Sequence, residues 1–106
     1  MRSVRFYPDA ELELTDARQW YALKKEGLDA EFMLCIDEAL SRIVQNPFLF
    51  PLSLKKTRKT LVRKFPNIIY YAVGAEEIMI VAVFHTITRP KTLAKKALSY
   101  DLPIFC

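Results

Sequence analysis

The sequence predicts an α+β domain in which an antiparallel helical hairpin lies on one face of a small twisted sheet. Two observations lead to this class. Apolar residues recur at helical spacing through most of residues 8–46, and three strand-like runs follow between residues 58 and 85, of which the last two are rich in β-branched and aromatic residues. The chain has 106 residues, about the length that one hydrophobic core can support, so we expect a single domain over residues 1–106.

A short strand and a first helix are expected at the N-terminus. Residues 3–7 alternate between apolar and polar and stop at Pro8, which also suits the first turn of a helix. Acidic residues follow, where the positive end of the helix dipole favours them, and Gly27 after two lysines is the expected stop signal. The predicted apolar face of this helix consists of Ala10, Leu14, Ala17 and Tyr21, widened by Trp20 and Leu23.

A second helix is expected to follow at once, with Asp29 or the residue before it as its N-terminal cap. It ends at Asn46, because the residue before Pro47 is pushed out of helical conformation. Since so few residues join the two helices, they must fold back on each other as an antiparallel hairpin. The apolar face of the second helix comprises Leu28, Phe32, Cys35, Ile36, Ala39, Leu40 and Ile43.

A three-stranded antiparallel meander is predicted for the second half, over residues 58–65, 67–73 and 78–85. The first of these strands carries many positive charges, which suit an exposed or partner-facing strand, and Pro66 ends it. The other two, joined through residues 74–77, have the pattern of a hairpin. Side chains alternate along a strand, so Tyr70 and Tyr71 should point to opposite faces, one packed and the other exposed.

The composition excludes several classes of site. With two glycines, no phosphate-binding glycine loop is present, so no nucleotide cofactor is expected. The chain has two cysteines without a Cys-x-x-Cys spacing and a single histidine, so no metal site is expected. Acidic residues precede any apolar run, so we expect no secretory signal peptide. The charge-free stretch 43–54 contains prolines and is too short for a membrane span, which leaves the cytoplasm as the expected location.

Charge is unevenly distributed along the chain. Residues 1–46 carry six basic and nine acidic residues, a net charge of −3, whereas residues 47–106 carry ten basic and three acidic residues, a net charge of +7. Such asymmetry indicates either a solvated strand face or a basic surface for an acidic partner, protein or nucleic acid. The densest basic segment contains Lys55, Lys56, Arg58, Lys59, Arg63 and Lys64 without an intervening acid.

The order of these elements and several local motifs resemble the ParE/RelE toxin superfamily of type II toxin–antitoxin systems, and most closely its ParE (plasmid stabilisation) branch. The resemblance spans residues 4–90, and each motif is weak alone, whereas their joint order and spacing are specific. The matching pieces are Tyr7-Pro8-x-Ala10, Trp20-Tyr21, Gly27-Leu28-x-x-x-Phe32, Ile43-x-x-Asn46-Pro47, Phe50-Pro51, Arg63-x-Phe65-Pro66, Ile69-Tyr70-Tyr71, residues 80–85 and Pro90.

The resemblance implies a toxin that is neutralised by a cognate antitoxin protein, with which it can form a hetero-oligomer. The resemblance to the ParE branch implies a protein that inhibits DNA gyrase and has no known hydrolytic chemistry. RelE-like members resemble metal-independent endoribonucleases that cleave mRNA in the ribosome. In both cases the basic segment, together with Arg89, is the expected surface for the antitoxin or the target.

Ribonuclease chemistry is disfavoured by the residues present. Cleavage needs a base, an acid and cations for the developing charge, which RelE-like proteins supply mostly from arginines and a tyrosine. Ile68 occupies the position that most nearly corresponds to one such arginine. After the last strand, Arg89 lies one residue further along the chain than the arginine that is often found in the family. The remaining catalytic candidates, each weak, are His85, Arg89, Tyr100 and Arg63.

Each of these candidates also has a structural interpretation. His85 follows an apolar strand, where a histidine commonly fixes a turn through a hydrogen bond, and the leucines around Tyr100 indicate a packed terminal segment. We therefore expect a gyrase-directed, ParE-like toxin. The alternatives are an mRNA endoribonuclease and a non-toxic interaction module on the same scaffold.

Overall fold

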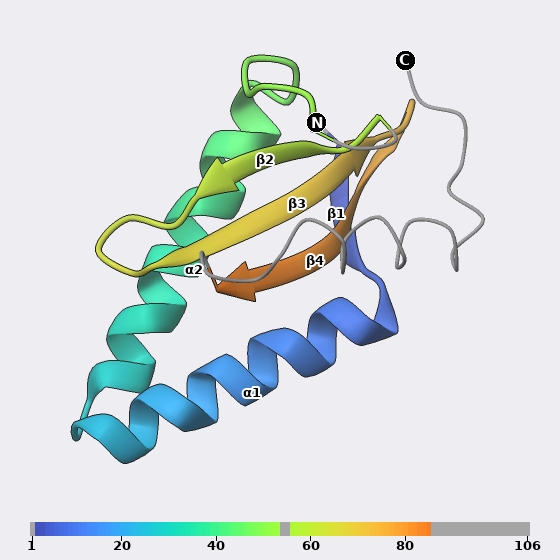
Figure 1. Ribbon diagram of the computed structural model, residues 1–106. Coiled ribbons are helices and arrows are strands. Elements are labelled where there is room, and N and C mark those ends of the chain that lie inside the picture. The colour runs from blue at the N-terminus through green and yellow to red at the C-terminus, as the bar shows by residue number, and fades with distance from the viewer. Residues whose placement is uncertain (1, 54–55, 86–106) are drawn as a thin grey trace.

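The helical hairpin and the sheet form two layers, in the order of elements that the sequence predicts. A computed structural model describes residues 2–53 and 56–85 of the chain. Both helices lie on the same face of the sheet (Figure 1). The elements are β1 Ser3–Phe6, α1 Pro8–Lys24, α2 Leu28–Gln45, β2 Arg58–Leu61, β3 Asn67–Val73 and β4 Glu77–His85.

The sheet is mixed, with the strand order β1-β4-β3-β2. The predicted meander is present, since β2 pairs antiparallel with β3 and β3 pairs antiparallel with β4. The N-terminal strand β1 joins the far edge and runs parallel to β4, an arrangement that the helical hairpin makes possible by carrying the chain over the sheet. The backbone N–H of Tyr7 continues this pairing by donating to the Ile80 carbonyl at 3.0 Å.

The core lies between the hairpin and the sheet, where the predicted helical faces meet. Tyr21, Phe32 and Phe65 form its aromatic centre, with ring centroids 4.8 to 5.1 Å apart. The widening of the α1 face by two further residues was wrong, since Trp20 is 53% and Leu23 88% exposed. The fully buried helical side chains are Ala10, Phe32, Ala39 and Ile43, with Ile36 at 1% exposed.

Gly27 sets the sharp connection between the helices. Its φ of +84° lies in the left-handed region, and it precedes α2 directly. The N–H of Leu28 donates to the Lys25 carbonyl at 3.1 Å, which closes the turn. The predicted stop signal is thus confirmed, and its position gives the hairpin its short connection.

Strand β2 is shorter than predicted, because it ends at Leu61 rather than at residue 65. The N–H of Val62 donates to the Asn67 carbonyl at 2.9 Å, and Lys64 adopts a positive φ of 69°. These features turn the chain towards β3 before Pro66. Arg63 therefore lies in the turn and not on a strand.

The pairing of β3 with β4 contains a register shift. Tyr70 pairs with Ala82, whereas Tyr71 pairs with Ile80, so that Val81 is the extra residue of a β-bulge. The two tyrosines point to opposite faces as predicted: Tyr71 is fully buried towards the helices, and Tyr70 is half-buried on the other face.

Candidate partner-binding surface

The predicted basic segment consists of residues with different surroundings. Lys56, Lys59 and Lys64 are exposed, and Lys56 and Lys64 occupy positive φ in turns on either side of β2. Lys55, Arg89 and Tyr100 lie outside the described residues. The exposed lysines thus keep the predicted basic character of this edge of the sheet.

Arg58 is tied to the connector that follows α2. Its Nη1 donates to the carbonyl of Phe50 at 2.7 Å and to that of Phe48 at 3.2 Å, and its guanidinium lies 5.3 Å from the centroid of the Phe48 ring. These contacts hold residues 48–50 against β2. A direct contact of Arg58 with a partner stays a prediction.

Arg63 and Arg42 share the carboxylate of Glu38 on α2. The Nε of Arg63 lies 3.4 Å from one Glu38 oxygen, while Arg42 donates to the other. Arg42 also donates from Nη2 to the Leu61 carbonyl at 2.9 Å, at the outer edge of β2. Sequence reasoning missed Arg42, although its spacing of four residues after Glu38 on a predicted helix was a signal for this ion pair.

A cavity of about 380 Å³ lies beside the exposed lysines, between α2, the connector and β2. Leu61, which lines the cavity, and Leu52, which follows the lining residue Pro51 in the sequence, are each 61% exposed. We name the combination of these lysines and leucines the β2 surface: Leu52, Lys56, Lys59, Leu61 and Lys64. The residues lining the cavity are Arg42, Phe50, Pro51, Lys59, Thr60, Leu61 and Ile68.

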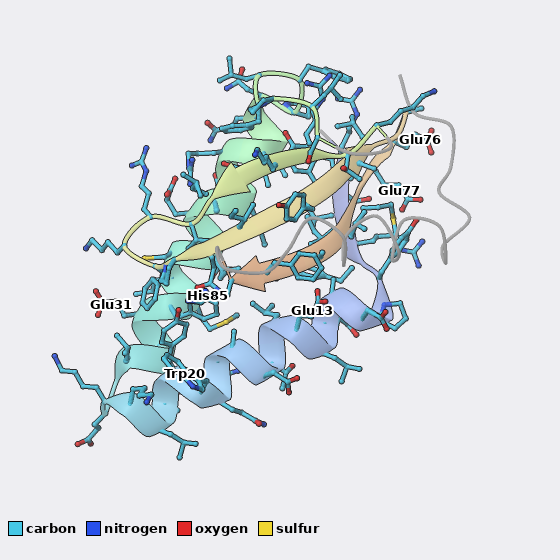
Figure 2. The ribbon with its side chains drawn as sticks, viewed as in Figure 1. Glu13, Trp20, Glu31, Glu76, Glu77 and His85 are labelled. Atoms are coloured by element: carbon cyan, nitrogen blue, oxygen red, sulfur yellow. The ribbon has the colours of Figure 1, made fainter. Side chains whose placement is uncertain are left out.

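The β2 surface combines positive charge with apolar area. Such a combination suits an amphipathic segment that carries acidic residues, because its apolar side chains can enter the cavity while its carboxylates meet the lysines. Figure 2 shows acidic side chains elsewhere, with Glu76 and Glu77 at the β3–β4 turn and Glu13 on α1.

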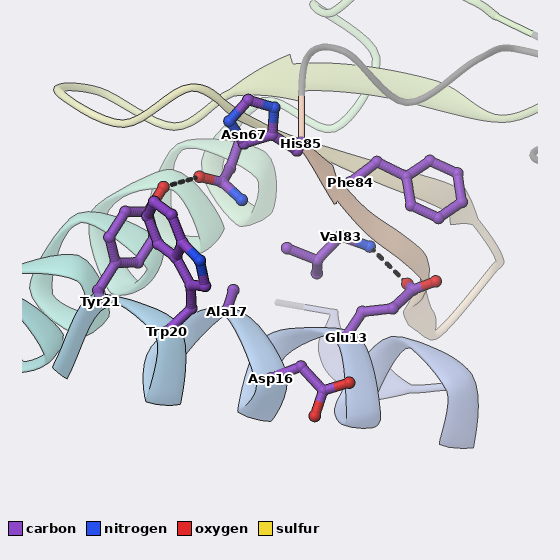
Figure 3. A pocket seen from close by; sticks show the side chains of 9 residues that line it. All are labelled: Glu13, Asp16, Ala17, Trp20, Tyr21, Asn67, Val83, Phe84 and His85. Carbon is purple, nitrogen blue, oxygen red and sulfur yellow. Dashed lines mark hydrogen bonds between the residues drawn. The ribbon is translucent and has the colours of Figure 1, made fainter. Parts of the chain in front are cut away.

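A second cavity, of about 480 Å³, lies between α1 and the end of β4 (Figure 3). The Glu13 side chain accepts a hydrogen bond from the backbone N–H of Val83 at 2.9 Å, and the Tyr21 hydroxyl donates to Asn67 Oδ1 at 2.7 Å. Burial raises the pKa of the Tyr21 phenol. His85 is exposed at the rim of this cavity.

The described catalytic candidates do not come together in one site. His85 lines the second cavity with Glu13 and Asp16, whereas Arg63 pairs with Glu38 on α2. Among residues 2–53 and 56–85, no arginine or lysine lines the cavity that holds His85. This part of the chain therefore does not provide, next to His85, the cation that phosphate chemistry requires.

Metal and membrane sites were searched over the same part of the chain. No group of histidine, cysteine and acidic side chains there has the arrangement of a metal site. None of the helices that the structure describes is long and apolar enough to cross a membrane.

A comparison with solved structures finds a similar fold in a chain of the chromosomal ParDE toxin–antitoxin system from P. aeruginosa. The superposition has a TM-score of 0.68 and covers 80% of this chain and 96% of that chain, at 18% sequence identity. The fold is ParE-like. No protein-family model and no curated protein sequence matches the chain. The order of strand, helical hairpin and meander that the sequence predicts is the order found in this ParE-like fold. The parallel pairing of β1 with β4 completes its sheet.

Proposed function

We propose that this protein is the toxin of a type II (plasmid stabilisation) toxin–antitoxin system, which inhibits DNA gyrase in the cytoplasm and is neutralised by a cognate antitoxin. The observation that carries the proposal is the ParE-like fold, found in a solved ParDE system and supported by the motifs from residue 4 to residue 90.

The β2 surface is the proposed contact for the antitoxin or the target. Its lysines are exposed, its leucines are solvent-accessible, and a cavity lies beside them. Lys55, Arg58, Arg63 and Arg89 extend the proposed surface along the sequence. An acidic amphipathic segment that folds on binding would match both the charge and the apolar area.

Gyrase inhibition is preferred to mRNA cleavage because of how the described residues are used. The strand position nearest to a ribonuclease arginine holds the half-buried Ile68, beside the Leu61 side of β2. Arg63 is engaged by Glu38, and His85 lies in a different cavity. The proposal therefore assigns no catalytic residue.

Expression in a host without the antitoxin tests the proposal. The toxin should stop growth, cause filamentation and induce the DNA-damage response, and co-expression of the short open reading frame beside its gene should restore growth. Purified protein should inhibit supercoiling by gyrase in a plasmid assay. Unimpaired supercoiling at a large molar excess of the protein would contradict the gyrase assignment.

Two further readouts separate the alternatives in the same cells. Cleavage of translated messages soon after induction, with intact gyrase activity, would support an endoribonuclease instead. Harmless expression without the antitoxin would support a non-toxic interaction module. Growth arrest with intact transcripts and inhibited gyrase supports the proposed toxin.

A further inference from the structure

The cavity between α1 and the end of β4 combines three features that the proposed toxin function does not use. Its walls include the apolar side chains of Ala17, Val83 and Phe84, the carboxylates of Glu13 and Asp16, and the indole of Trp20 (Figure 3). Its volume is about 480 Å³, more than a single side chain occupies. It lies apart from the β2 surface, since none of its lining residues belongs to α2 or β2.

The charge around this cavity is negative. Along α1, the acids Asp9, Glu11, Glu13 and Asp16 exceed Arg18 and Lys24, and within the described residues the cavity wall contains no basic side chain other than the imidazole of His85. Asp16 is exposed, and within residues 2–53 and 56–85 its carboxylate has no hydrogen-bond or ion-pair partner. A cation entering the cavity would therefore meet a carboxylate that is available to it.

The indole of Trp20 is already arranged for contact with a cation. Its side chain is 53% exposed, although tryptophan usually buries more of its area in a fold, and the ammonium of Lys24 lies 4.7 Å from its ring centroid. The ring of Tyr21 also contacts this indole, in a T-shaped arrangement with centroids 5.1 Å apart, so a further ligand would reach the part of the ring that stays exposed. In Figure 2, Trp20, Glu13 and His85 appear along the side of α1 that turns towards the end of β4.

We propose that this cavity binds a lysine or arginine side chain presented by a partner protein. The alkyl part of the side chain would lie against Ala17 and Val83, and its charged end would lie beside the Asp16 carboxylate and the exposed part of the Trp20 indole. Guanidinium and ammonium groups are the cations that combine an apolar stem with attraction to both a carboxylate and an aromatic face. The site does not depend on the toxin proposal, because it uses none of the β2 surface.

Intrinsic fluorescence measures this binding directly, because Trp20 is the only tryptophan in the chain. The full chain is titrated with a short capped peptide that has one arginine between two leucines, and with the same peptide carrying citrulline, a neutral analogue of similar shape. We expect a saturable change with the arginine peptide and about two- to fivefold weaker binding of the citrulline peptide, the range of an exposed charge pair or cation–π contact.

Matched variants assign the charge contact to its residue. Asp16→Asn should weaken the arginine peptide about two- to fivefold and leave the citrulline peptide unchanged, a coupling that a general change in the fold would not produce. Asp37→Asn, the same substitution at an exposed position of α2, should affect neither peptide. Equal affinity for the two peptides, no saturable signal, or equal effects of the two variants would overturn the proposal.

Discussion

Tyr71 connects the centre of the sheet to the connector that follows α2. Its side chain is fully buried, and its hydroxyl donates to the Pro47 carbonyl at 2.8 Å. Tyr71→Phe leaves that buried carbonyl without this donor, so we expect the free energy of unfolding to fall by about 1–2 kcal/mol. Urea denaturation measures the change. Tyr70→Phe is the control, because Tyr70 is half-buried on the other face, and an equal loss there would contradict the assignment.

The same phenol predicts a loss of stability in alkali. Burial raises the pKa of Tyr71 to about 12, with a smaller lowering from the positive charge of Arg58. Above pH 10.0, its ordinary value, the unfolded chain loses this proton while the folded chain keeps it, so the unfolded state is favoured as the pH rises. Stability should therefore fall between pH 10 and about 12, and less steeply in Tyr71→Phe than in the original chain. Parallel curves for both proteins would contradict this.

Arg42 and Arg63 bind the same carboxylate but should differ in energetic importance. Arg42 is three-quarters buried and also donates to the Leu61 carbonyl, whereas the Arg63 side chain is 69% exposed. We expect Arg42→Ala to lower the free energy of unfolding by about 2 kcal/mol, since the hydrogen bonds of its guanidinium to Glu38, Thr60 and the Leu61 carbonyl are lost. Arg63→Ala should lower it by less than about 1 kcal/mol. Thermal and urea unfolding of both variants compare them, and the reverse order would refute this division.

These arginines show what a single sequence cannot predict at the scale of a residue. A run of basic residues indicates a positive surface, and the exposed Lys56, Lys59 and Lys64 confirm that much. Which guanidinium is engaged by carbonyls or by a distant carboxylate depends on contacts between α2 and β2. Those contacts exist only after the chain has folded.

At the scale of an element, the connection between α1 and α2 depends on one backbone conformation. Gly27 has a φ of +84°, and a Cβ added there would meet no atom within 4 Å, so the cost of a side chain would come from the backbone alone. We expect Gly27→Ala to lower the free energy of unfolding by about 1 kcal/mol. Gly27→Asn should cost less, because asparagine tolerates the left-handed region better. Chemical denaturation ranks the three proteins, and a greater loss in the asparagine variant would contradict the explanation.

Elements with a clear apolar period were predicted well, and their ends less so. The faces of both helices and the bounds of β3 follow from spacing, because burial on one side imposes a period on the sequence. The end of β2 was not predicted. The turn that follows it contains Lys64 at a positive φ, a backbone conformation that a lysine in the sequence rarely indicates. Trp20 was placed in the core by its apolar character, but on α1 it is Tyr21, the next residue, that points into the core, and Trp20 lies on the exposed side of the helix.

At the scale of the whole molecule, the helical hairpin is acidic and the β2 edge of the sheet is basic. Association with an acidic antitoxin should therefore be fast at low ionic strength and slow markedly as salt is added. Lys56→Glu with Lys59→Glu should reduce the association rate about tenfold or more at low salt. Stopped-flow mixing with the antitoxin encoded beside the gene measures the rate.

The matched control reverses the same amount of charge on the other layer. Arg18→Glu with Lys25→Glu alters two exposed basic residues of the helical hairpin, away from the β2 surface. This variant should associate at close to the original rate. If both pairs of substitutions slowed association equally, net charge rather than the β2 surface would control the encounter.

The extra residue at Val81 has a consequence for comparing this chain with its relatives. Ile80 and Val83 both face the helices although they are three positions apart, an odd spacing that would place them on opposite faces of a regular strand. The alternation of inward and outward side chains therefore restarts in the middle of β4. Two homologous chains aligned without a gap over residues 78–85 would present different side chains to the helices if only one of them had the irregularity. Placing a one-residue gap at this point is therefore a structural decision, and it determines which positions are judged equivalent up to His85.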